Sequence, residues 1–317
     1  MVSIIIPYYN RPKKLERCLR SILDQTCTDF EVVIVDDYSP KPLVLDIDDR
    51  VQVYRNEKNL GPGFSRNVGL KNSKGNYVAF LDSDDYWHND FLRNTMKAFI
   101  DNKNIVMVCS QVVEVDENGH IFKRRRNDKF EVTQILPYIL QYGRPWCTSS
   151  CLWDASHAKK NGLWIDSRNW EDYVFDVSIA VANNKIKTLK DTLVYYDASG
   201  DYKLSNSKKQ NSLLEKYKSL KAIINLNYDI GDVLIKELCY LNLKHICLGL
   251  AAQCNDIKNK DLAKKYLYLI ASNKMINQFE YFLLLLSNHY ITGRYLRHKK
   301  ASMNKTTNRK RSLTSTS

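Results

Sequence analysis

The sequence contains no long hydrophobic run. Its longest late apolar stretch, Phe282 to Leu286, is far too short to cross a bilayer. The first residues, Val2 to Ile6, have the pattern of a buried strand and lack the basic start and cleavage site of a signal peptide. We therefore expect a cytoplasmic protein in a reducing compartment.

Several common ligand-binding patterns are absent as well. The eight cysteines form no C-x-x-C pair, which argues against a zinc ribbon, and the six histidines have no metal-ligand spacing. No G-x-x-x-x-G-K-[ST] motif is present, so the chain is not a P-loop enzyme. Gly61-Pro62-Gly63 is too short to be a dinucleotide-binding fingerprint.

Acidic residues are missing from the last part of the sequence. No Asp or Glu follows Glu280, whereas eight Lys and Arg residues lie between Arg294 and Arg311. The formal net charge of +13 is therefore largely an effect of this basic tail, residues 294–317. The tail is either a solvated end or a segment that contacts an anionic membrane surface peripherally. We expect no nucleic-acid partner, because no recognition module for nucleic acid is present.

Short apolar runs alternate with segments of helical spacing through the first part of the chain. The runs typical of buried strands are Val2–Ile6, Phe30–Val35, Val51–Tyr54, Tyr77–Leu81 and Ile105–Cys109. The segments typical of helices are Leu15–Leu23, Pro62–Lys71 and Asn89–Asn102. This alternation predicts an α/β protein with a mostly parallel sheet flanked by helices.

The later parts of the chain have other patterns. The segments Asp116–Gly119, Val174–Ala182 and Lys187–Tyr196 are typical of a hairpin turn, a helix and a strand. Four tryptophans between Pro145 and Tyr173 favour core packing over stacking on a sugar or base. After Ser205 only helical spacing recurs, which predicts a C-terminal helical region. Its predicted helices are Leu213–Leu226, Val233–Leu250, Leu262–Ala271 and Phe279–Leu286.

Two clusters of carboxylates follow predicted buried strands directly. Asp36-Asp37 ends one strand, and Asp82-Ser83-Asp84-Asp85 ends another. Asp favours turns, so ordinary turn chemistry would explain either cluster alone. Two clusters at one edge of a sheet, however, match the place where open α/β sheets bind ligands. Crowded carboxylates suit a hard divalent cation such as Mn²⁺ or Mg²⁺, whose remaining ligand positions a diphosphate can fill.

These clusters are part of a resemblance to a known family. The segments that carry it are Ser3–Asn10, Val35–Ser39, Asn59–Gly63, Ser65–Asn67 and Phe80–Asp85. Their residues, order and spacing resemble those of the inverting family 2 glycosyltransferases, which have the GT-A fold. The resemblance is strong from Met1 to Asp116, weaker to about Ser207, and absent from the helical C-terminal region.

The resemblance implies a division of the chain. A GT-A-like catalytic domain would cover residues 1–205, with a nucleotide-sugar half over about 1–116 and an acceptor half over about 117–205. The helical C-terminal region would cover residues 206–293, and the basic tail would follow over 294–317.

The resemblance also implies roles for single residues in donor binding. Pro7, Tyr9 and Asp37 match the positions that hold the nucleotide base, normally uracil, and Asn10 belongs to the same motif. Arg66 matches a basic residue near the base and diphosphate. Asp82-Ser83-Asp84 matches the D-x-D motif, in which Asp82 faces the ribose and the metal, Ser83 lies between, and Asp84 is the principal metal ligand. The cofactor would be Mn²⁺ or Mg²⁺, acting as a Lewis acid on the donor diphosphate.

Trp170-Glu171-Asp172-Tyr173 looks like the late acidic motif of the same family. The resemblance assigns Asp172 as the general base that takes a proton from the acceptor hydroxyl. Glu171 is the alternative base, or it binds the acceptor or orients Asp172. A plain helix N-terminus would also explain two adjacent acids, because they favour the helix dipole.

One segment departs from the family pattern. Where many members have a basic residue or His after the late strand, this chain reads Tyr195-Tyr196-Asp197-Ala198-Ser199, with an acid in place of the base. Lys203 is a candidate substitute.

The expected activity is a metal-dependent, inverting transfer of a hexose or hexosamine from a nucleotide-diphosphate sugar, with UDP favoured. The acceptor would be a hydroxyl of a growing surface glycan such as capsule or O-antigen, free or lipid-linked, and the enzyme would be cytoplasmic or peripheral on the inner membrane face. Two alternatives remain open. One is a nucleotidyltransferase, which the lack of glycine between Pro7 and Lys14 disfavours, and the other is a non-catalytic glycan- or nucleotide-binding module.

Overall fold

The computed structural model describes residues 1–45, 48–116, 118–124, 131–167, 169–199, 209–228, 232–256 and 268. The chain divides into two compact units. The first consists of residues 1–207 together with 218–238, and the second of residues 208–217 together with 239–317.

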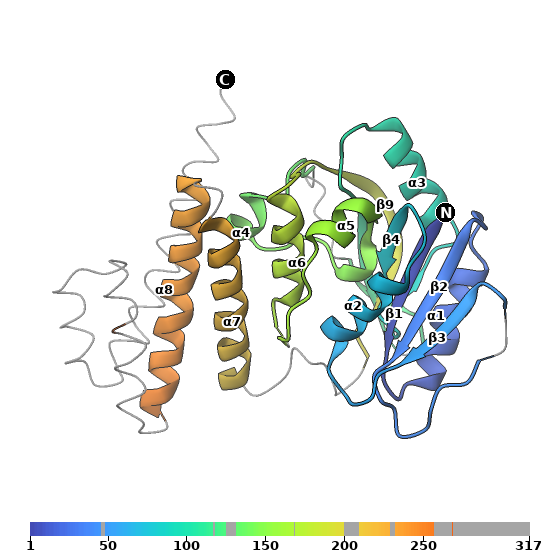
Figure 1. Ribbon diagram of the computed structural model, residues 1–317, viewed down its shortest axis with the longest axis horizontal. Coiled ribbons are helices and arrows are strands. Elements are labelled where there is room, and N and C mark those ends of the chain that lie inside the picture. The colour runs from blue at the N-terminus through green and yellow to red at the C-terminus, as the bar shows by residue number, and fades with distance from the viewer. Residues whose placement is uncertain are drawn as a thin grey trace. The chain divides into compact units, whose positions relative to one another are not determined.

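A mixed sheet, nine-stranded in the described part of the chain, forms the centre of the first unit (Figure 1). Its strands are β1 (Val2–Tyr8), β2 (Phe30–Asp36), β3 (Val51–Arg55), β4 (Tyr77–Phe80), β5 (Tyr86–Trp87), β6 (Met107–Val115), β7 (Ile121–Arg124), β8 (Cys151–Asp154) and β9 (Ile186–Asp197). They lie in the order β3-β2-β1-β4-β8-β6-β9-β5, and β7 pairs with β6.

The strands from the start of the chain pair in parallel, as the alternation of strands and helices predicts. β1 lies between β2 and β4, and β2 pairs with β3. Beyond β4 the pairing changes, because β8 runs antiparallel to both β4 and β6, while β6 and β9 are parallel. The α/β sheet with flanking helices is therefore confirmed, and its parallel pairing is concentrated in the half that carries the first acidic clusters.

The helices of the first unit connect these strands. They are α1 (Pro12–Leu23), α2 (Pro62–Asn72), α3 (Phe91–Asp101), α4 (Tyr138–Tyr142), α5 (Ala155–Asn161) and α6 (Glu171–Ala180), with a 3-10 turn η1 (Thr148–Ser150). The predicted hairpin at Asp116–Gly119 joins β6 to β7 and is confirmed.

Two of these helices cover opposite faces of the sheet at β1. Ile4 and Ile6 pack in one core cluster with Leu15 and other residues of α1. Ile5 points to the other face, because successive side chains of a strand alternate. On that face α2 comes so close that a Cβ atom at Gly69 would lie 2.3 Å from Cγ2 of Ile5. Gly69 thus permits the close approach of α2 to the strand whose end carries Tyr9.

The tryptophans of the middle segment are largely core residues, as predicted. Trp146, Trp153 and Trp164 are each less than 5% exposed. Trp153 and Trp164 both pack against Phe175 of α6 with ring centroids 5.2 and 4.4 Å apart. This aromatic cluster fixes α6, whose first turn holds Glu171 and Asp172, against the sheet.

The C-terminal helical region begins with α7 (Lys209–Tyr228) and α8 (Val233–Asp256), where helical spacing predicts them. Apart from Tyr268, the two later predicted helices, Lys203 and the basic tail lie outside the described residues. None of the described helices combines the length and the apolar character that a membrane crossing requires.

Candidate active site

The carboxyl ends of β1, β2 and β4 meet at one edge of the sheet. Tyr8 pairs with Asp36 in the register of β1 and β2, and the Asp37 amide donates a hydrogen bond of 2.8 Å to the Tyr8 carbonyl. On the other side of β1, the Leu81 amide donates to the Ile5 carbonyl at 2.9 Å. The segments after these three strands, which hold Tyr9, Asp37 and Asp82, therefore start from neighbouring positions at the same edge.

Asp37 organises the loop that leads into α2. Its Oδ1 accepts hydrogen bonds from Asn56 Nδ2 and the Leu60 amide, and its Oδ2 accepts one from the Gly61 amide, each at 2.8 Å. Gly61 has φ +86°, in the left-handed region that favours glycine. A carboxylate oxygen has two lone pairs, so Oδ2 keeps one position for a ligand donor.

The residues predicted beside the base differ in exposure. Pro7 is buried within β1, whereas the Tyr9 ring is 46% exposed at the strand end. Asn10 is also exposed, and its amide donates to Ser39 Oγ at 2.9 Å. A second exposed ring, Tyr38, follows Asp37 and lies under the Arg55 guanidinium at 5.0 Å. Two aromatic rings are thus accessible at this edge, and the sequence reasoning considered only Tyr9.

The two acids of the D-x-D motif are each paired with an arginine. Arg66 Nη2 donates to Asp82 Oδ1 at 2.6 Å, and Arg11 pairs with Asp84 Oδ2. The side chains of Asp82 and Asp84 are 33% and 27% exposed, while Ser83 between them is buried. Burial and the neighbouring Asp82 charge raise the pKa of Asp84 despite Arg11 and Lys14. No group of three or more His, Cys, Asp and Glu side chains suited to a metal ion occurs among the described residues.

Asp85 is a buried structural acid rather than a ligand. Its Oδ2 accepts a hydrogen bond from Ser149 Oγ at 2.5 Å, and its Oδ1 accepts one from the Asp197 amide at 3.1 Å. Burial and then the charges of Asp84 and Asp82 raise its pKa. Asp85 therefore ties the end of β4 to η1 and to the end of β9.

Arg66 connects the donor-side acids to the late acidic pair. It is 3% exposed, its Nη1 lies 3.6 Å from Glu171 Oε1, and its guanidinium lies 4.4 Å from the Trp164 ring centroid. Within the described residues, its buried Nε and Nη1 have no hydrogen-bond acceptor. Asp82, two residues after the end of β4, and Glu171 on α6 thus share one buried cation, which still has N–H donors without an acceptor in the described part of the chain.

Glu171 and Asp172 lie in the first turn of α6, three residues earlier than the predicted helix start. Trp170 precedes them with φ 65° and stacks on Tyr173 with centroids 4.7 Å apart. A left-handed tryptophan is uncommon, and it turns the chain sharply just before the two acids. Burial, followed by the Asp172 charge, raises the pKa of Glu171 to about 7 despite the opposing Arg66 charge.

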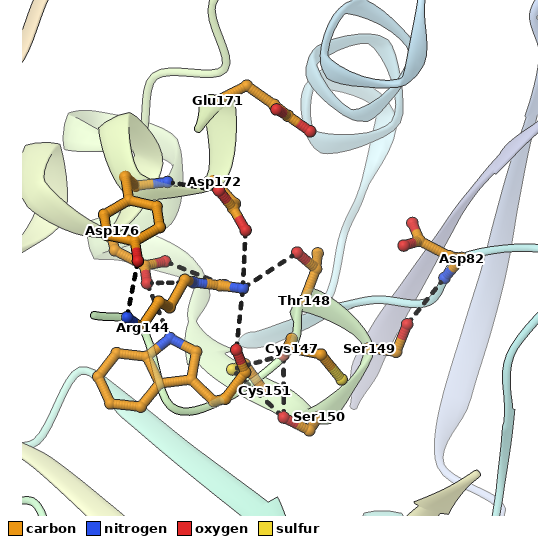
Figure 2. Close-up of polar contacts among 12 residues, drawn as sticks. Asp82, Arg144, Cys147, Thr148, Ser149, Ser150, Cys151, Glu171, Asp172 and Asp176 are labelled. Carbon is orange, nitrogen blue, oxygen red and sulfur yellow. Dashed lines mark hydrogen bonds and ion pairs between the residues drawn. The ribbon is translucent and has the colours of Figure 1, made fainter. Parts of the chain in front are cut away.

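Asp172 has different hydrogen-bond partners from Glu171. Its Oδ2 accepts a hydrogen bond of 3.0 Å from Arg144 Nη1, and its Oδ1 accepts one of 2.9 Å from the Tyr173 amide. Figure 2 shows Arg144 between Asp172 and Asp176, with Glu171 directed elsewhere. The two acids of the late motif therefore have separate cationic partners, Arg66 for Glu171 and Arg144 for Asp172.

The acid that departs from the family pattern, Asp197, is a buried structural residue. It accepts hydrogen bonds from the Ser199 amide and hydroxyl at 2.8 and 2.5 Å and pairs with Lys14 at 3.2 Å and with Arg17. Burial acts to raise its pKa, but these hydrogen bonds outweigh burial and lower it. Asp197 thus joins the end of β9 to α1.

Arg144, Asp176 and Ser149 were not predicted from the sequence. None belongs to the quoted motifs, and Arg144 is 28 positions away from Asp172 along the chain. The available signal was weak: Asp176 is an acid inside an otherwise apolar helix segment, which calls for a buried partner.

Comparison with known proteins relates part of this chain to one family. The sequence model of glycosyl transferase family 2 matches residues 3–153. A relative from Rickettsia felis, described as an uncharacterized glycosyltransferase, is 27% identical over 285 residues, which cover 88% of this chain and 45% of the relative. TarS of Staphylococcus aureus, named a poly(ribitol-phosphate) beta-N-acetylglucosaminyltransferase, is 31% identical over 208 residues, covering 61% of this chain and 35% of TarS.

Solved structures show the same fold. The structure of Staphylococcus aureus TarS 1–349 in complex with UDP-GlcNAc superposes with a TM-score of 0.58 and 20% identity, covering 86% of this chain and 91% of that one. Residues 3–153 thus match the family 2 glycosyltransferases, and the chain has the GT-A-like fold that its motifs predict. It spans about half the length, or less, of the curated relatives named above.

Proposed function

We propose that this chain is an inverting glycosyltransferase that moves a hexosyl or hexosaminyl group from a UDP-sugar to a hydroxyl of a growing surface glycan. The observation that carries the proposal is the position of Arg66, which pairs with Asp82 of the D-x-D motif and with Glu171 of the late acidic motif. Donor-binding and acceptor-activating acids are thereby adjacent, as transfer between two substrates requires.

In this proposal, the sheet edge at the ends of β1 and β2 binds the nucleotide-sugar donor. The exposed Tyr9 ring offers a face on which a base can stack, and Asp37 Oδ2 offers an acceptor for a base N–H. Arg66 has buried N–H groups without an acceptor among the described residues, which suits them to donor phosphate oxygens. TarS, a relative of this chain, has been solved with UDP-GlcNAc, which favours a UDP-sugar as donor.

A divalent cation fits this donor site by its chemistry. Asp82 and Asp84 provide carboxylate oxygens, the ligands that Mn²⁺ and Mg²⁺ prefer, and both side chains are partly exposed. These two residues would hold the ion, which supplies Lewis-acid stabilisation of the leaving diphosphate when bound. Arg11 and Arg66 neutralise the same carboxylates in the protein alone.

Asp172 is the general base in this proposal. Its carboxylate takes the proton of the acceptor hydroxyl as that oxygen attacks the anomeric carbon. The bond between the anomeric carbon and the diphosphate oxygen breaks at the same time, and its electron pair leaves with UDP. Attack on the face opposite to UDP inverts the configuration. Glu171, partly buried and close to Arg66, is placed to bind or orient the acceptor.

A hydrolysis and transfer screen tests the proposal. Nucleotide sugars are incubated with the protein and Mn²⁺ or Mg²⁺, and released UDP or GDP is measured. We expect UDP release that is lost in Asp172→Asn while UDP binding persists. Asp191→Asn, at an exposed aspartate of β9, is the matched control and keeps full activity. UDP binding without turnover of any nucleotide sugar would instead favour a binding module, and pyrophosphate release from a nucleoside triphosphate would favour a nucleotidyltransferase.

The basic tail, residues 294–317, is proposed to hold the enzyme peripherally at an anionic membrane surface, near a lipid-linked acceptor. The proposal rests on charge alone, because each Lys or Arg near such a surface contributes roughly 1 kcal/mol. Deletion of residues 293–317 is expected to abolish sedimentation with vesicles that contain anionic lipid. Vesicle binding that persists after the deletion would contradict it.

A further inference from the structure

The structure contains a buried ion-pair network behind Asp172, which the family motifs do not describe. Arg144 lies between α4 and η1, and its side chain is 5% exposed. Its guanidinium contacts two acids of α6: Nη1 donates to Asp172 Oδ2 at 3.0 Å, and Nε donates to Asp176 Oδ2 at 2.7 Å. Asp172 and Asp176 are one helical turn apart, so their side chains lie on the same face of α6.

The far side of the network is anchored firmly. Asp176 is fully buried and also accepts a hydrogen bond from Trp146 Nε1 at 2.8 Å. Arg144 Nη1 donates to the Trp146 carbonyl at 3.3 Å, and the Arg144 amide donates to the Tyr173 hydroxyl at 2.7 Å (Figure 2). A planar guanidinium with this many fixed partners has little freedom to turn. The orientation of Nη1 toward Asp172 is therefore set by groups that are themselves buried.

The near side of the network leaves Asp172 able to react. Each of its carboxylate oxygens accepts one of the hydrogen bonds described above, from Arg144 and from the Tyr173 amide. Each oxygen therefore retains a lone pair for an acceptor hydroxyl. The side chain is 27% exposed, whereas Arg144 and Asp176 are buried. The same arrangement, a reacting group held by a buried partner, orients bases in other enzymes.

We infer that Arg144 is a positioning residue, which fixes the orientation of the Asp172 carboxylate, and that Asp176 and Trp146 hold Arg144 in place for this task. The inference rests on the proposed function and makes it sharper, because it selects Asp172 over Glu171 as the base. Glu171 pairs with Arg66 at 3.6 Å, whereas the acids that pair with Arg144 are Asp172 and Asp176.

The charges around Asp172 determine the direction of the expected pH effects. The negative groups that face it are Glu171 and Asp176 on α6, and the positive groups are Arg144 and, on α2, Arg66. Tyr173, a weak acid, is a further titratable neighbour. Loss of Arg144 leaves the acids Glu171 and Asp176 in excess around Asp172. Their negative charges disfavour the charged form of the Asp172 carboxylate. Loss of the Asp176 charge has the opposite effect, because it removes a repelling neighbour and leaves Arg144 to Asp172 alone.

The test compares variants on each side of the network. Arg144→Met alone leaves the buried Asp176 without a cationic partner and risks unfolding, so it is combined with Asp176→Leu, because apolar replacement of a buried ion pair is often neutral for stability. We expect kcat of this double variant to fall about 100-fold, with an unchanged KM for the nucleotide sugar. Asp176→Asn should move the acid limb of the kcat profile to lower pH, and Arg144→Lys should recover part of kcat.

The outcomes separate this inference from the proposed function. Arg20→Met, at an arginine whose side chain is 73% exposed, is the control and should behave as wild type. A wild-type kcat in the folded double variant would overturn the role of Arg144, even if the protein transfers sugar. An acid limb that moves to higher pH in Asp176→Asn would also overturn it. No turnover by the wild type would overturn the proposed function and this inference with it.

Discussion

The guanidinium of Arg66 lies 3.6 Å from the carboxylate of Glu171 and is almost completely buried. The same guanidinium donates a 2.6 Å hydrogen bond to Asp82, so one side chain of α2 links two acidic motifs that are far apart in the sequence. A buried cation shared by two acids organises both, and it makes each of them sensitive to the loss of the other.

Arg66→Met is therefore expected to impair the donor site and the acceptor site together. Asp82 and Glu171 lose their shared cation, and a donor phosphate loses the N–H groups that Arg66 would offer. We expect a fall in kcat/KM of about 100-fold or more, because charged hydrogen bonds in such sites contribute several kcal/mol. Steady-state kinetics with the preferred nucleotide sugar measure it. Arg93→Met, at an exposed arginine of α3, is the control. A change limited to KM for the acceptor would contradict the shared role.

The raised pKa of Glu171 makes the free energy of unfolding depend on pH. Its pKa is raised to about 7, chiefly by burial. Between its unfolded pKa, near 4.5, and about 7, the folded protein binds more protons at this site than the unfolded chain, so the stability contributed by Glu171 is lost as pH rises through 7. Glu171→Gln removes this dependence and should stabilise the protein at pH 8 relative to wild type, by roughly 1–3 kcal/mol, but not at pH 4.

Urea unfolding at pH 4, 6 and 8 measures this effect, provided that the wild type unfolds in a single step at each pH. Asp191→Asn, at an exposed acid, is the control. A constant difference between Glu171→Gln and wild type across this range would show that Glu171 does not titrate near neutral pH.

Much of the donor-side geometry could be predicted from the sequence because it is local. A buried parallel strand is a continuous apolar run, and the residue after such a run must lie at the sheet edge, which places Tyr9, Asp37 and Asp82. The antiparallel strands of the second half have no such signal, since β5 has two residues and β8 has four. The partners of Arg144 and Arg66 lie on distant segments, and a pattern of nearby residues carries no information about such pairs.

The packing of α2 on β1 gives a prediction about stability. A Cβ atom at Gly69 would lie 2.3 Å from Cγ2 of Ile5, a branched side chain in the middle of a strand with little freedom to move. Gly69→Ala should therefore push α2 from the sheet and cost about 1–3 kcal/mol of unfolding free energy, the usual range for overpacking. Because α2 carries Arg66, donor affinity should fall as well. Lys71→Ala, at an exposed position of α2, should do neither. Denaturant unfolding measures the cost, and a stability equal to wild type would show that the helix can shift freely.

Arg11 and Asp84 give a prediction about metal binding. Arg11 pairs with Asp84 in the protein alone, and its side chain is 37% exposed, so it can leave the carboxylate at little cost. A cation bound at Asp84 must displace this guanidinium. Arg11→Ala is therefore expected to bind Mn²⁺ about two- to fivefold more tightly in the presence of UDP, whereas Asp84→Asn should lose the ion. Lys13→Ala removes an exposed positive charge from the start of α1, two residues after Arg11. It controls for the general effect of lost positive charge on Mn²⁺ affinity. Electron paramagnetic resonance of free Mn²⁺ measures the affinity without reference to activity. If Arg11→Ala and Lys13→Ala change it equally, Arg11 does not compete for the site, and turnover that survives complete chelation would remove the metal from the proposal.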